Sequence, residues 1–516
     1  MFEDVRKADN LLMPLRIHNM NALSFYAPEK ATKNLQVQTV GEQRRLVIST
    51  NMLRMFGYVP GAQTEEVSIG AGAGFQIRLL ENAERGKKVY EREYKHRKNN
   101  PCETLLDVRR KDLLEVSIPI KCEHVHITLE YGLITVKPVT SHQARAIKNA
   151  KSAKERYSAF VGLSSGIDAK HMVKDGFVIH SLLDKRVLEA RDKTDITETG
   201  ILTAMHNMPI GTVYNEDIYD VDPVRIAKAC EDNPFTVAVF SPQCDDFSNV
   251  KSNSAKVKSV ENLDSTKDMI LPILDIIKWT ASPTVVIENV PGFVKSDVFE
   301  IFQLQMRRLG YKELTDVYDA RAYGGLTGRK RAYAMYSCLP CVLEAPIKTQ
   351  SKTTAGAIGL KYLSQMRDIT DNISIQKGIE SSRLRSFNAE SEFCPTFLKS
   401  QSRMAKDTVT FEHEGRHYFP TNEMMAELMG IDNSFEAVSK TIESEQIGQS
   451  VEVPLSRAIM RSIKNHLNAF FAGDSNTQKK QAVINEAKPK VSYPESKSIE
   501  ALVTDTARGD NYQFAF

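Results

Sequence analysis

A cysteine stands in a polar turn directly after an apolar stretch in the middle of the chain. Residues 235–241 are predicted to form a strand, and Pro242 and Cys244 follow it. A thiol at the carboxyl end of a strand is positioned as a nucleophile, whereas a structural cysteine is normally buried inside an element. Cys244 is therefore a candidate nucleophile, and a core position is the alternative.

A carboxyl group and two guanidinium groups that could act with this thiol occur later in the sequence. Glu288 ends a second apolar stretch, residues 283–288, where a carboxyl group could serve as a general acid or simply cap the next turn. Arg329 and Arg331 alternate in an extended segment, so both side chains should point to the same face. Taken alone, this arginine segment is equally typical of an exposed basic loop.

Strands and helices alternate from residue 157 onward, which predicts an α/β fold with a doubly wound, mostly parallel sheet. The predicted strands are residues 157–163, 177–183, 211–214, 235–241 and 284–288, and the predicted helices are residues 169–175, 223–230, 269–279 and 298–309. Because ligands bind at the carboxyl ends of the strands in such sheets, Cys244 and Glu288 should meet at one edge.

The order and spacing of these motifs resemble the DNA (cytosine-5) methyltransferase family. That family carries Pro-Pro-Cys-Gln-x-x-Ser, Glu-Asn-Val, Gln-x-Arg-x-Arg and Gly-Asn-Ser-Val in this order. Here residues 242–248 read Pro-Gln-Cys-Asp-Asp-Phe-Ser, residues 288–290 Glu-Asn-Val, residues 327–331 Thr-Gly-Arg-Lys-Arg and residues 448–451 Gly-Gln-Ser-Val. The resemblance covers about residues 157–467.

This resemblance implies a doubly wound S-adenosylmethionine-dependent methyltransferase fold and transfer of a methyl group to C5 of a cytosine that is flipped out of duplex DNA. In the family, a cysteine thiolate adds to C6 of the base, a carboxyl group assists at N3, and guanidinium groups hold the base and nearby phosphates. By resemblance, these roles fall to Cys244, Glu288, Arg329 and Arg331. The cofactor is S-adenosylmethionine, and no metal is implied.

The resemblance also assigns cofactor-binding residues. The family motif Phe-x-Gly-x-Gly-Gly is matched by residues 160–166, and Gly-Asp-Ile is matched by Glu-Asp-Ile at residues 216–218. Asp184 could hold the ribose hydroxyls, although the glutamate of the family falls nearer Leu182. The implied cofactor-binding residues are Phe160, Gly162, Gly166, Asp184, Asp217, Ile218, Pro242 and Ser450.

Several residues depart from the family motifs. They are Ser164 and Ser165 in place of glycine, Gln243 in place of proline, Asp245 and Thr327 in place of glutamine, and Gln449 in place of asparagine. These changes concern cofactor affinity and loop geometry, whereas Cys244, Glu288 and Arg329 are all present. The sequence therefore favours an active, divergent enzyme.

The catalytic domain is predicted in two parts, residues 150–340 and 417–471. Between them, residues 341–416 lose periodicity and gather Ser, Thr, Lys and Arg, which is where the family places target recognition. Residues 472–516 are predicted to be a flexible tail, because they are polar and poor in aliphatic side chains.

Residues 1–145 are predicted to form a β-rich accessory domain of unknown role, with strands at residues 45–49, 66–70, 75–80, 114–118 and 124–129. Between residues 85 and 112, ten Lys or Arg residues stand against five Asp or Glu residues. This basic run could contact a phosphate backbone or simply be a solvated face.

Composition sets further limits. The chain has 68 basic and 65 acidic residues, a net charge of +3, and seven cysteines, an odd number that is typical of reduced thiols in the cytoplasm. No apolar run approaches the roughly 20 residues that span a bilayer, so no membrane association is expected.

The expected partner is double-stranded DNA, bound by a monomer. Within a restriction–modification system the partner would also include a cognate restriction endonuclease, whereas an orphan enzyme carried on a mobile element would have none. Two alternatives remain: a tRNA cytosine-5 methyltransferase, which uses the same motifs on RNA, and a catalytically silent DNA-binding regulatory homologue.

Overall fold

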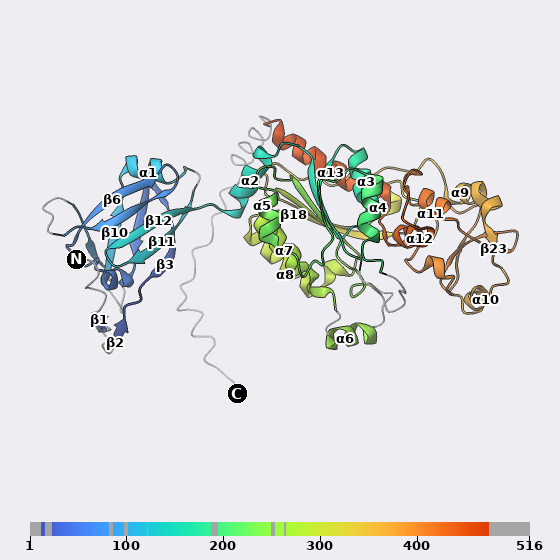
Figure 1. The fold of residues 1–516 in the computed structure, drawn as a ribbon, viewed down its shortest axis with the longest axis horizontal. Coiled ribbons are helices and arrows are strands. Elements are labelled where there is room, and N and C mark those ends of the chain that lie inside the picture. The colour runs from blue at the N-terminus through green and yellow to red at the C-terminus, as the bar shows by residue number, and fades with distance from the viewer. Residues whose placement is uncertain are drawn as a thin grey trace. The chain divides into compact units, whose positions relative to one another are not determined.

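The computed structural model describes residues 12–15, 23–81, 86–96, 102–120, 122–164, 166–186, 195–248, 253–262 and 265–473 (Figure 1). The chain divides into two compact units, Met1–Lys151 with Arg307–Gly310, and Ser152–Met306 with Tyr311–Phe516. The predicted flexible tail lies, from residue 474 on, outside the described residues. No helix of the described part is long and apolar enough to cross a membrane.

The first unit is built from antiparallel strands. Its strands are β1 (Leu12–Leu15), β2 (Leu23–Tyr26), β3 (Ala31–Gln36), β4 (Gln38–Val40), β5 (Gln43–Ser49), β6 (Gln63–Gly70), β7 (Gly74–Leu79), β8 (Lys87–Lys88), β9 (Tyr90–Glu93), β10 (Cys102–Val108), β11 (His124–Glu130) and β12 (Leu133–Val139), and its helices are η2 (Asn51–Phe56), α1 (Lys111–Ser117) and α2 (His142–Ser152). One sheet has the order β3-β11-β12-β7-β6-β8 and another the order β4-β5-β10-β9. Alternating side chains such as Leu46 and Ile48 of β5 and Ile134 and Val136 of β12 fill one shared core.

The predicted strand at residues 114–118 is wrong, because this segment belongs to helix α1. Leu113, Leu114 and Ser117 are buried at helical spacing, while Val116 is 53% exposed. An alternating strand would have put Leu114 and Val116 on the same face.

The second unit contains a seven-stranded sheet with the order β15-β14-β13-β16-β17-β19-β18. Its strands are β13 (Ser158–Gly162), β14 (Val178–Leu183), β15 (Thr212–Tyr214), β16 (Val237–Phe240), β17 (Thr284–Asn289), β18 (Lys312–Asp319) and β19 (Lys330–Ser337). The first five strands in this order are parallel, and β19 runs antiparallel to both β17 and β18. The predicted doubly wound methyltransferase fold is therefore confirmed.

Helices cover both faces of this sheet (Figure 1). The helices of this part of the chain are α3 (Ile167–Lys174), α4 (Thr199–Asn207), α5 (Pro223–Ala229), α6 (Asn253–Glu261), η3 (Lys267–Met269), α7 (Ile270–Thr280), η4 (Phe293–Lys295), α8 (Asp297–Arg308) and η5 (Ala320–Ala322), and α6 lies apart from the sheet. Every residue of β13 and β16 is buried, as expected for parallel strands that are covered on both sides. The strand order reverses between β13 and β16, and such a switch point is where ligands bind in this class of fold.

Residues 341–416 are more regular than the sequence predicts. They and the following segment form α9 (Ala355–Tyr362), η6 (Leu363–Gln365), β20 (Arg367–Asp368), α10 (Ile373–Glu380), β21 (Arg385–Phe387), η7 (Gln401–Arg403), β22 (Val409–His413), β23 (Arg416–Phe419), α11 (Asn422–Leu428), α12 (Lys440–Gln449) and α13 (Val453–Phe471). The four short strands make a sheet of order β20-β23-β22-β21. Its side chains, including Phe387 and Phe411, share a core with Met424, Met425 and Met429.

Candidate active site

The turn that carries Cys244 is held against the end of the neighbouring strand. Phe240 and Ile287 are paired in the parallel β16–β17 ladder, so the chain leaves both strands at the same edge. The side-chain amide of Asn289 donates to the Pro242 carbonyl at 3.0 Å, and the N–H groups of Phe247 and Ser248 donate to the Cys244 carbonyl. These contacts fix the thiol beside the end of β17.

Glu288 and Arg331 form an ion pair between adjacent strands. Arg331 Nε lies 2.9 Å from Glu288 Oε1, and both side chains are 13% exposed. Burial raises the pKa of Glu288, while the charges of Arg331 and Arg329 oppose this rise. A carboxyl group with a raised pKa is suited to donating a proton near neutral pH.

Arg329 is a buried cross-link rather than a freely presented cation. Its guanidinium group donates to the carbonyls of Phe397 (2.9 Å), Gly448 (3.1 Å) and Gln449 (3.0 Å), and the residue is only 3% exposed. Its Nε is buried without a hydrogen-bond partner in the described part of the chain. Burial and the charge of Arg331 lower its pKa to about 9. Of the two arginines, Arg331 is therefore the one next to Glu288, and Arg329 ties three segments together.

We expect Arg329→Ala to lower the free energy of unfolding by about 3 kcal/mol, because three carbonyls would lose a charged donor in a buried site. Arg329→Lys should recover little of this loss, since one ammonium group cannot reproduce the fork. Chemical denaturation measures the change. Arg321→Ala, which removes a largely exposed pair with Asp319, is the control and should cost less than about 1 kcal/mol. Equal losses for Arg329 and Arg321 would contradict the cross-linking role.

The Cys244 thiol is half-buried among the other candidate catalytic groups. Burial raises its pKa, the charges of Arg331 and Arg329 lower it, and the charges of Asp245 and Glu288 raise it. All four groups predicted to be catalytic therefore lie within electrostatic reach of one another. In this arrangement Arg331 is the cation that most favours a thiolate.

The glycines of the predicted cofactor motif permit close packing around the turn after β13. A Cβ on Gly162 would lie 2.5 Å from Cδ1 of Phe240, and one on Gly166 would lie 2.9 Å from Cβ of Ala204. Gly166 (φ 95°) and Leu163 (φ 61°) are both in the left-handed region. A leucine in this conformation costs about 1 kcal/mol, and such strain concentrates in functional loops. Ser165 lies outside the described residues.

The other residues proposed to hold the cofactor differ in exposure. Phe160 is fully buried against Phe235 and Phe240, so it shapes the core under the turn. Asp184, at the end of β14, is partly buried, and burial raises its pKa to about 7. Leu182, the position nearer to that of the family's glutamate, is completely buried. A desolvated carboxyl group at this edge fits the hydroxyl groups of a ribose.

The remaining predicted cofactor residues follow β15 and α12. Asp217 is partly exposed and accepts a hydrogen bond from the Tyr219 N–H at 3.2 Å, while Ile218 is buried. Ser450 ends α12 and donates to the Ile447 carbonyl at 2.9 Å. The carboxyl ends of β13, β14 and β15 therefore present a strained turn and two carboxyl groups, which fit a charged nucleoside cofactor.

Two acidic residues near the site were missed by sequence reasoning. Glu452 accepts the Thr327 N–H at 2.7 Å, and burial raises its pKa to about 7. Its other oxygen packs so tightly that a Cβ on Gly325 would lie 1.7 Å away. Asp168, in the first turn of α3, is electrostatically linked to Glu288. The only sequence feature that could have indicated Glu452 and Asp168 is that each is an acidic residue within an apolar stretch, and this feature alone is weak evidence for a functional site.

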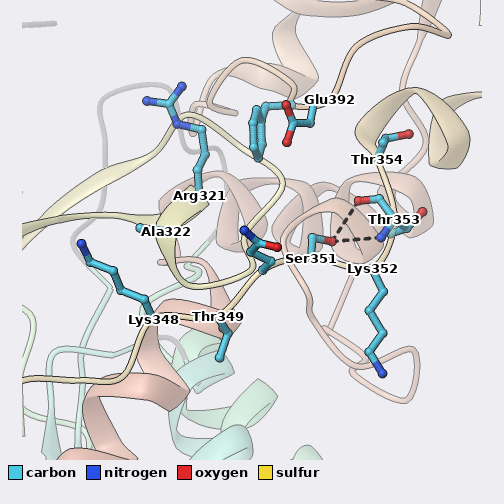
Figure 2. Close-up of a pocket in the computed structure, with 11 residues that line it drawn as sticks. Arg321, Ala322, Lys348, Thr349, Ser351, Lys352, Thr353, Thr354 and Glu392 are labelled. Atoms are coloured by element: carbon cyan, nitrogen blue, oxygen red, sulfur yellow. Dashed lines mark hydrogen bonds between the residues drawn. The ribbon is translucent and has the colours of Figure 1, made fainter.

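A polar cavity of about 870 Å³ lies between η5 and the start of α9 (Figure 2). Its lining includes the cationic side chains Arg321, Lys348 and Lys352 and the hydroxyl groups of Thr349 and Ser351. The lining also includes Glu392 and Phe393, so three cationic side chains stand against one carboxyl group and the cavity carries a net positive charge that can attract phosphate groups. In the described part of the chain, no group of three or more His, Cys, Asp or Glu side chains is arranged to hold a metal ion.

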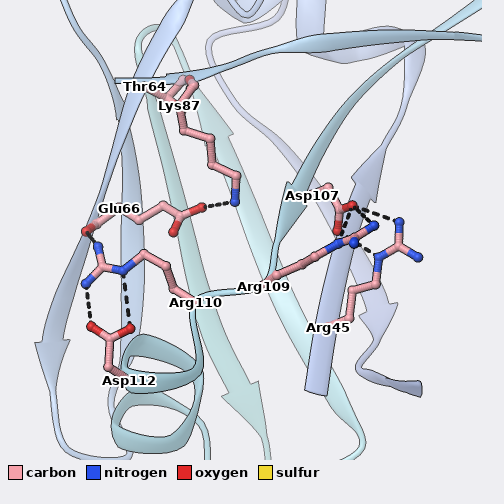
Figure 3. Close-up of polar contacts among 8 residues, drawn as sticks. All are labelled: Arg45, Thr64, Glu66, Lys87, Asp107, Arg109, Arg110 and Asp112. Atoms are coloured by element: carbon pink, nitrogen blue, oxygen red, sulfur yellow. Dashed lines mark hydrogen bonds and ion pairs between the residues drawn. The ribbon is translucent and has the colours of Figure 1, made fainter. Parts of the chain in front are cut away.

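Much of the charge in the basic run of the first unit is already paired. Arg109 and Arg45 both bind Asp107, Arg110 binds Asp112, and Lys87 binds Glu66 (Figure 3). Residues 85 and 97–101 of this run lie outside the described residues. The pairing reduces the charge that this face can offer to phosphates, although Lys88, Arg92 and Lys95 are exposed.

The seven-stranded sheet, with five parallel strands and helices on both faces, has the doubly wound arrangement expected of a methyltransferase fold. Residues 201–337 match the protein family described as C-5 cytosine-specific DNA methylase. This segment includes Cys244, Glu288, Arg329 and Arg331. The resemblance to cytosine-5 methyltransferases seen in the motifs is therefore confirmed, and this family uses S-adenosylmethionine as its methyl donor.

Individual proteins with similar sequences or folds match about half to three-fifths of the chain. A protein of Methanocaldococcus jannaschii whose name assigns it to the type II methyltransferases is 25% identical over 277 residues, which are 49% of this chain and 72% of that protein. Two solved structures are similar in fold to this chain. The Entamoeba histolytica methyltransferase EhMeth has 15% identity and a TM-score of 0.47, and the match covers 60% of this chain and 98% of that one. The S. pombe Dnmt2 methyltransferase has 17% identity and a TM-score of 0.46, and the match covers 59% of this chain and 97% of that one.

Proposed function

We propose that the protein transfers a methyl group from S-adenosylmethionine to C5 of a flipped cytosine in duplex DNA, through a covalent bond between Cys244 and C6. The observation that carries this proposal is the convergence of Cys244, Glu288 and Arg331 at one edge of the sheet, within the segment that matches the family. C5 of cytosine is a poor nucleophile until a thiolate has added to C6. Each of these three side chains has a defined part in that addition.

Arg331, Cys244 and Glu288 have different roles in the proposed reaction. The Arg331 charge favours the Cys244 thiolate, which bonds to C6. Electron density then builds on N3, and the Glu288 carboxyl group supplies a proton or hydrogen bond there. Arg331, placed 2.9 Å from Glu288, also lies where it can contact the base edge and its phosphate.

The residues proposed to hold the cofactor are the turn at residues 162–166, Asp184 and Asp217. When bound, S-adenosylmethionine supplies an electrophilic methyl group for C5. The partly buried Asp184 carboxyl group would accept from the ribose hydroxyls, and Asp217 would accept from the adenine amino group. Ile218, Pro242 and Ser450 would complete the walls of this pocket.

Duplex DNA is the proposed substrate because residues 341–416 form a folded region with its own sheet, and a polar cavity with three cationic side chains lies at its edge. Incubation with tritiated S-adenosylmethionine and equal amounts of mixed-sequence DNA and tRNA tests this. Label at C5 of cytosine in DNA is the expected result. Label in tRNA alone would make the protein a tRNA methyltransferase, and cofactor binding without label in either polymer would favour a silent regulator.

The state of the enzyme on DNA is also part of the proposal. A monomer on DNA is expected, and sedimentation of the complex with a short duplex would measure it. A cognate restriction endonuclease stays a prediction from the family resemblance. Bisulfite sequencing of host DNA after expression would give the modified sequence, which such an endonuclease would have to share.

We expect deletion of residues 1–145 to leave cytosine methylation measurable, because the proposed site lies wholly in the second unit. DNA affinity should fall, and the slope of log affinity against log salt should flatten by about 0.9 for each phosphate that the shortened protein no longer neutralises. Exposed Lys88, Arg92 and Lys95 are the cations expected to matter. Binding titrations at several salt concentrations measure the slope. An unchanged slope would remove the DNA-binding role, and a truncated chain that fails to fold would refute the boundary near residue 145.

A further inference from the structure

A second carboxyl group lies close to the proposed active site. Asp168 stands in the first turn of α3, and its carboxyl group is within electrostatic reach of Glu288, Arg329 and Arg331. Its Oδ1 atom is buried and has no hydrogen-bond partner among the described residues. Because an unpaired buried carboxylate is costly, this group is favoured in its protonated form.

Two hydroxyl groups, those of Tyr333 and Ser456, lie near these carboxyl groups. Tyr333 of β19 stands directly opposite Glu288 of β17 in the antiparallel ladder, so the two side chains share one face of the sheet. The Tyr333 hydroxyl is buried, and among the described residues no group lies in hydrogen-bonding geometry with it. Ser456 of α13 is the polar neighbour of both Asp168 and Tyr333, and it favours the ionised form of each. Asp168, Ser456, Tyr333 and Glu288 are therefore neighbouring polar side chains from α3, α13, β19 and β17, which we call the carboxyl cluster.

The two carboxyl groups of this cluster are not equivalent. Arg331 pairs directly with Glu288 and stabilises its anion. Burial, followed by the charge of Glu288, raises the pKa of Asp168 to about 7. Two carboxyl groups in one buried site oppose each other's ionisation, so below neutral pH the pair holds one proton, on Asp168 in the resting site.

Resting on the proposed function, we propose that Asp168 is a positioning residue that stores the proton delivered through Glu288 to N3 of the cytosine. When the Cys244 sulfur bonds to C6, the π electrons of the ring shift until an electron pair resides on N3. The single proton of the pair passes from Asp168 through the Ser456 and Tyr333 hydroxyls to Glu288, and from Glu288 to N3, which leaves both carboxyl groups ionised until that proton returns. After C5 has been methylated and has lost its proton to solvent, the C6–sulfur bond breaks, and the N3 proton returns to the carboxyl pair.

The test is the pH dependence of the single-turnover rate in the full-length protein. The groups that face Glu288 are Ser241, Cys244, Arg329, Arg331, Tyr333 and Asp168, and those that face Asp168 are Glu288, Arg329, Arg331, Tyr333 and Ser456. Asp168→Asn removes the group that holds the shared proton and leaves only Glu288, whose anion Arg331 stabilises, so the site loses its proton at lower pH. We expect the alkaline limb to move down by about one pH unit, giving an about tenfold lower rate above neutral pH and little change below about pH 6.

An infrared measurement provides a readout that does not need activity. Titration of the carboxyl C=O bands in the full-length protein should show several groups with midpoints near pH 7, of which one disappears in Asp168→Asn. The bands of Asp184 and Glu452, whose pKa values are also raised to about 7, should remain in both proteins. Glu288→Gln should move the midpoint of Asp168 to lower pH, because it removes the opposing charge.

A matched control and a second variant keep the inference testable. Asp316→Asn removes an exposed carboxyl group that faces Tyr333 from β18, and it should leave the pH profile unchanged. If Asp168→Asn fails to fold, Ser456→Ala should shift the alkaline limb in the same direction. An active wild type whose profile is identical in Asp168→Asn would overturn the inference alone, as would a rate loss that is uniform across pH. A wild type that methylates no cytosine in DNA or RNA would overturn the proposed function, and the inference with it.

Discussion

Cys244→Ser should lose at least about 10³-fold of the methyl-transfer rate while retaining the wild-type melting temperature. The substitution changes one atom in a half-buried turn whose contacts are made by the backbone, so folding has little reason to change. The serine hydroxyl is a far weaker nucleophile than a thiolate at neutral pH, and Arg331 cannot compensate for that difference. Single-turnover transfer of tritium from labelled S-adenosylmethionine measures the effect.

A covalent trap identifies the nucleophile directly. DNA that carries fluorine at C5 of the target cytosine should form a stable adduct with the wild type, because the final proton cannot be removed. Peptide mapping should place the adduct on Cys244. Cys230→Ser is the control, since Cys230 is 4% exposed and burial raises its pKa to about 12. An adduct on Cys230 or Cys394 would refute the assignment of Cys244.

Glu288→Gln should reduce the rate by about 10²- to 10⁴-fold with cofactor affinity retained, because the amide keeps the shape of the carboxyl group but cannot donate its proton to N3. The pKa of Glu288 is raised, so the acid form is available nearer to neutral pH than for an ordinary glutamate. The rate of the wild type should therefore fall as pH rises through that pKa. The residual rate of Glu288→Gln should lose this dependence.

Calorimetric titration with S-adenosylmethionine shows whether Glu288→Gln is slow because it binds the cofactor weakly or because the chemical step is impaired. Unchanged cofactor affinity together with the slow rate would place Glu288 at the reacting base. Asp316→Asn, which changes an exposed carboxyl group on the edge strand β18, is the matched carboxyl-to-amide control and should retain the full rate. A Glu288→Gln enzyme with more than about half of the wild-type rate would exclude general acid assistance by this residue.

The sequence by itself predicted the sheet and the place of the thiol and the carboxyl group on it. The strands that carry them, β16 and β17, are continuous apolar runs because they are buried on both faces, and such runs are visible locally. Parallel strands deliver the residues that follow them to one edge, so the proximity of Cys244 and Glu288 follows from strand direction alone.

Sequence reasoning was least accurate for elements of only a few residues and for strands whose partners lie far away in the sequence. The strand predicted at residues 114–118 is a helix because a short run of apolar and polar residues does not distinguish the two. Residues 341–416 looked aperiodic because their strands are only two to five residues long, and β20 pairs with β23 about 50 residues away. Short strands leave too few positions for alternation to be recognised.

The roles of the charged groups were decided by tertiary structure alone. The sequence placed Arg329 and Arg331 on one face, but the carbonyls that bind Arg329 come from residues 68, 119 and 120 positions away. Likewise, counting ten basic residues in the N-terminal run could not show that Asp107, Asp112 and Glu66 neutralise several of them. The physical reason is that strand formation depends on neighbours in sequence, whereas the protonation and availability of a charge depend on burial and on partners that only folding brings near.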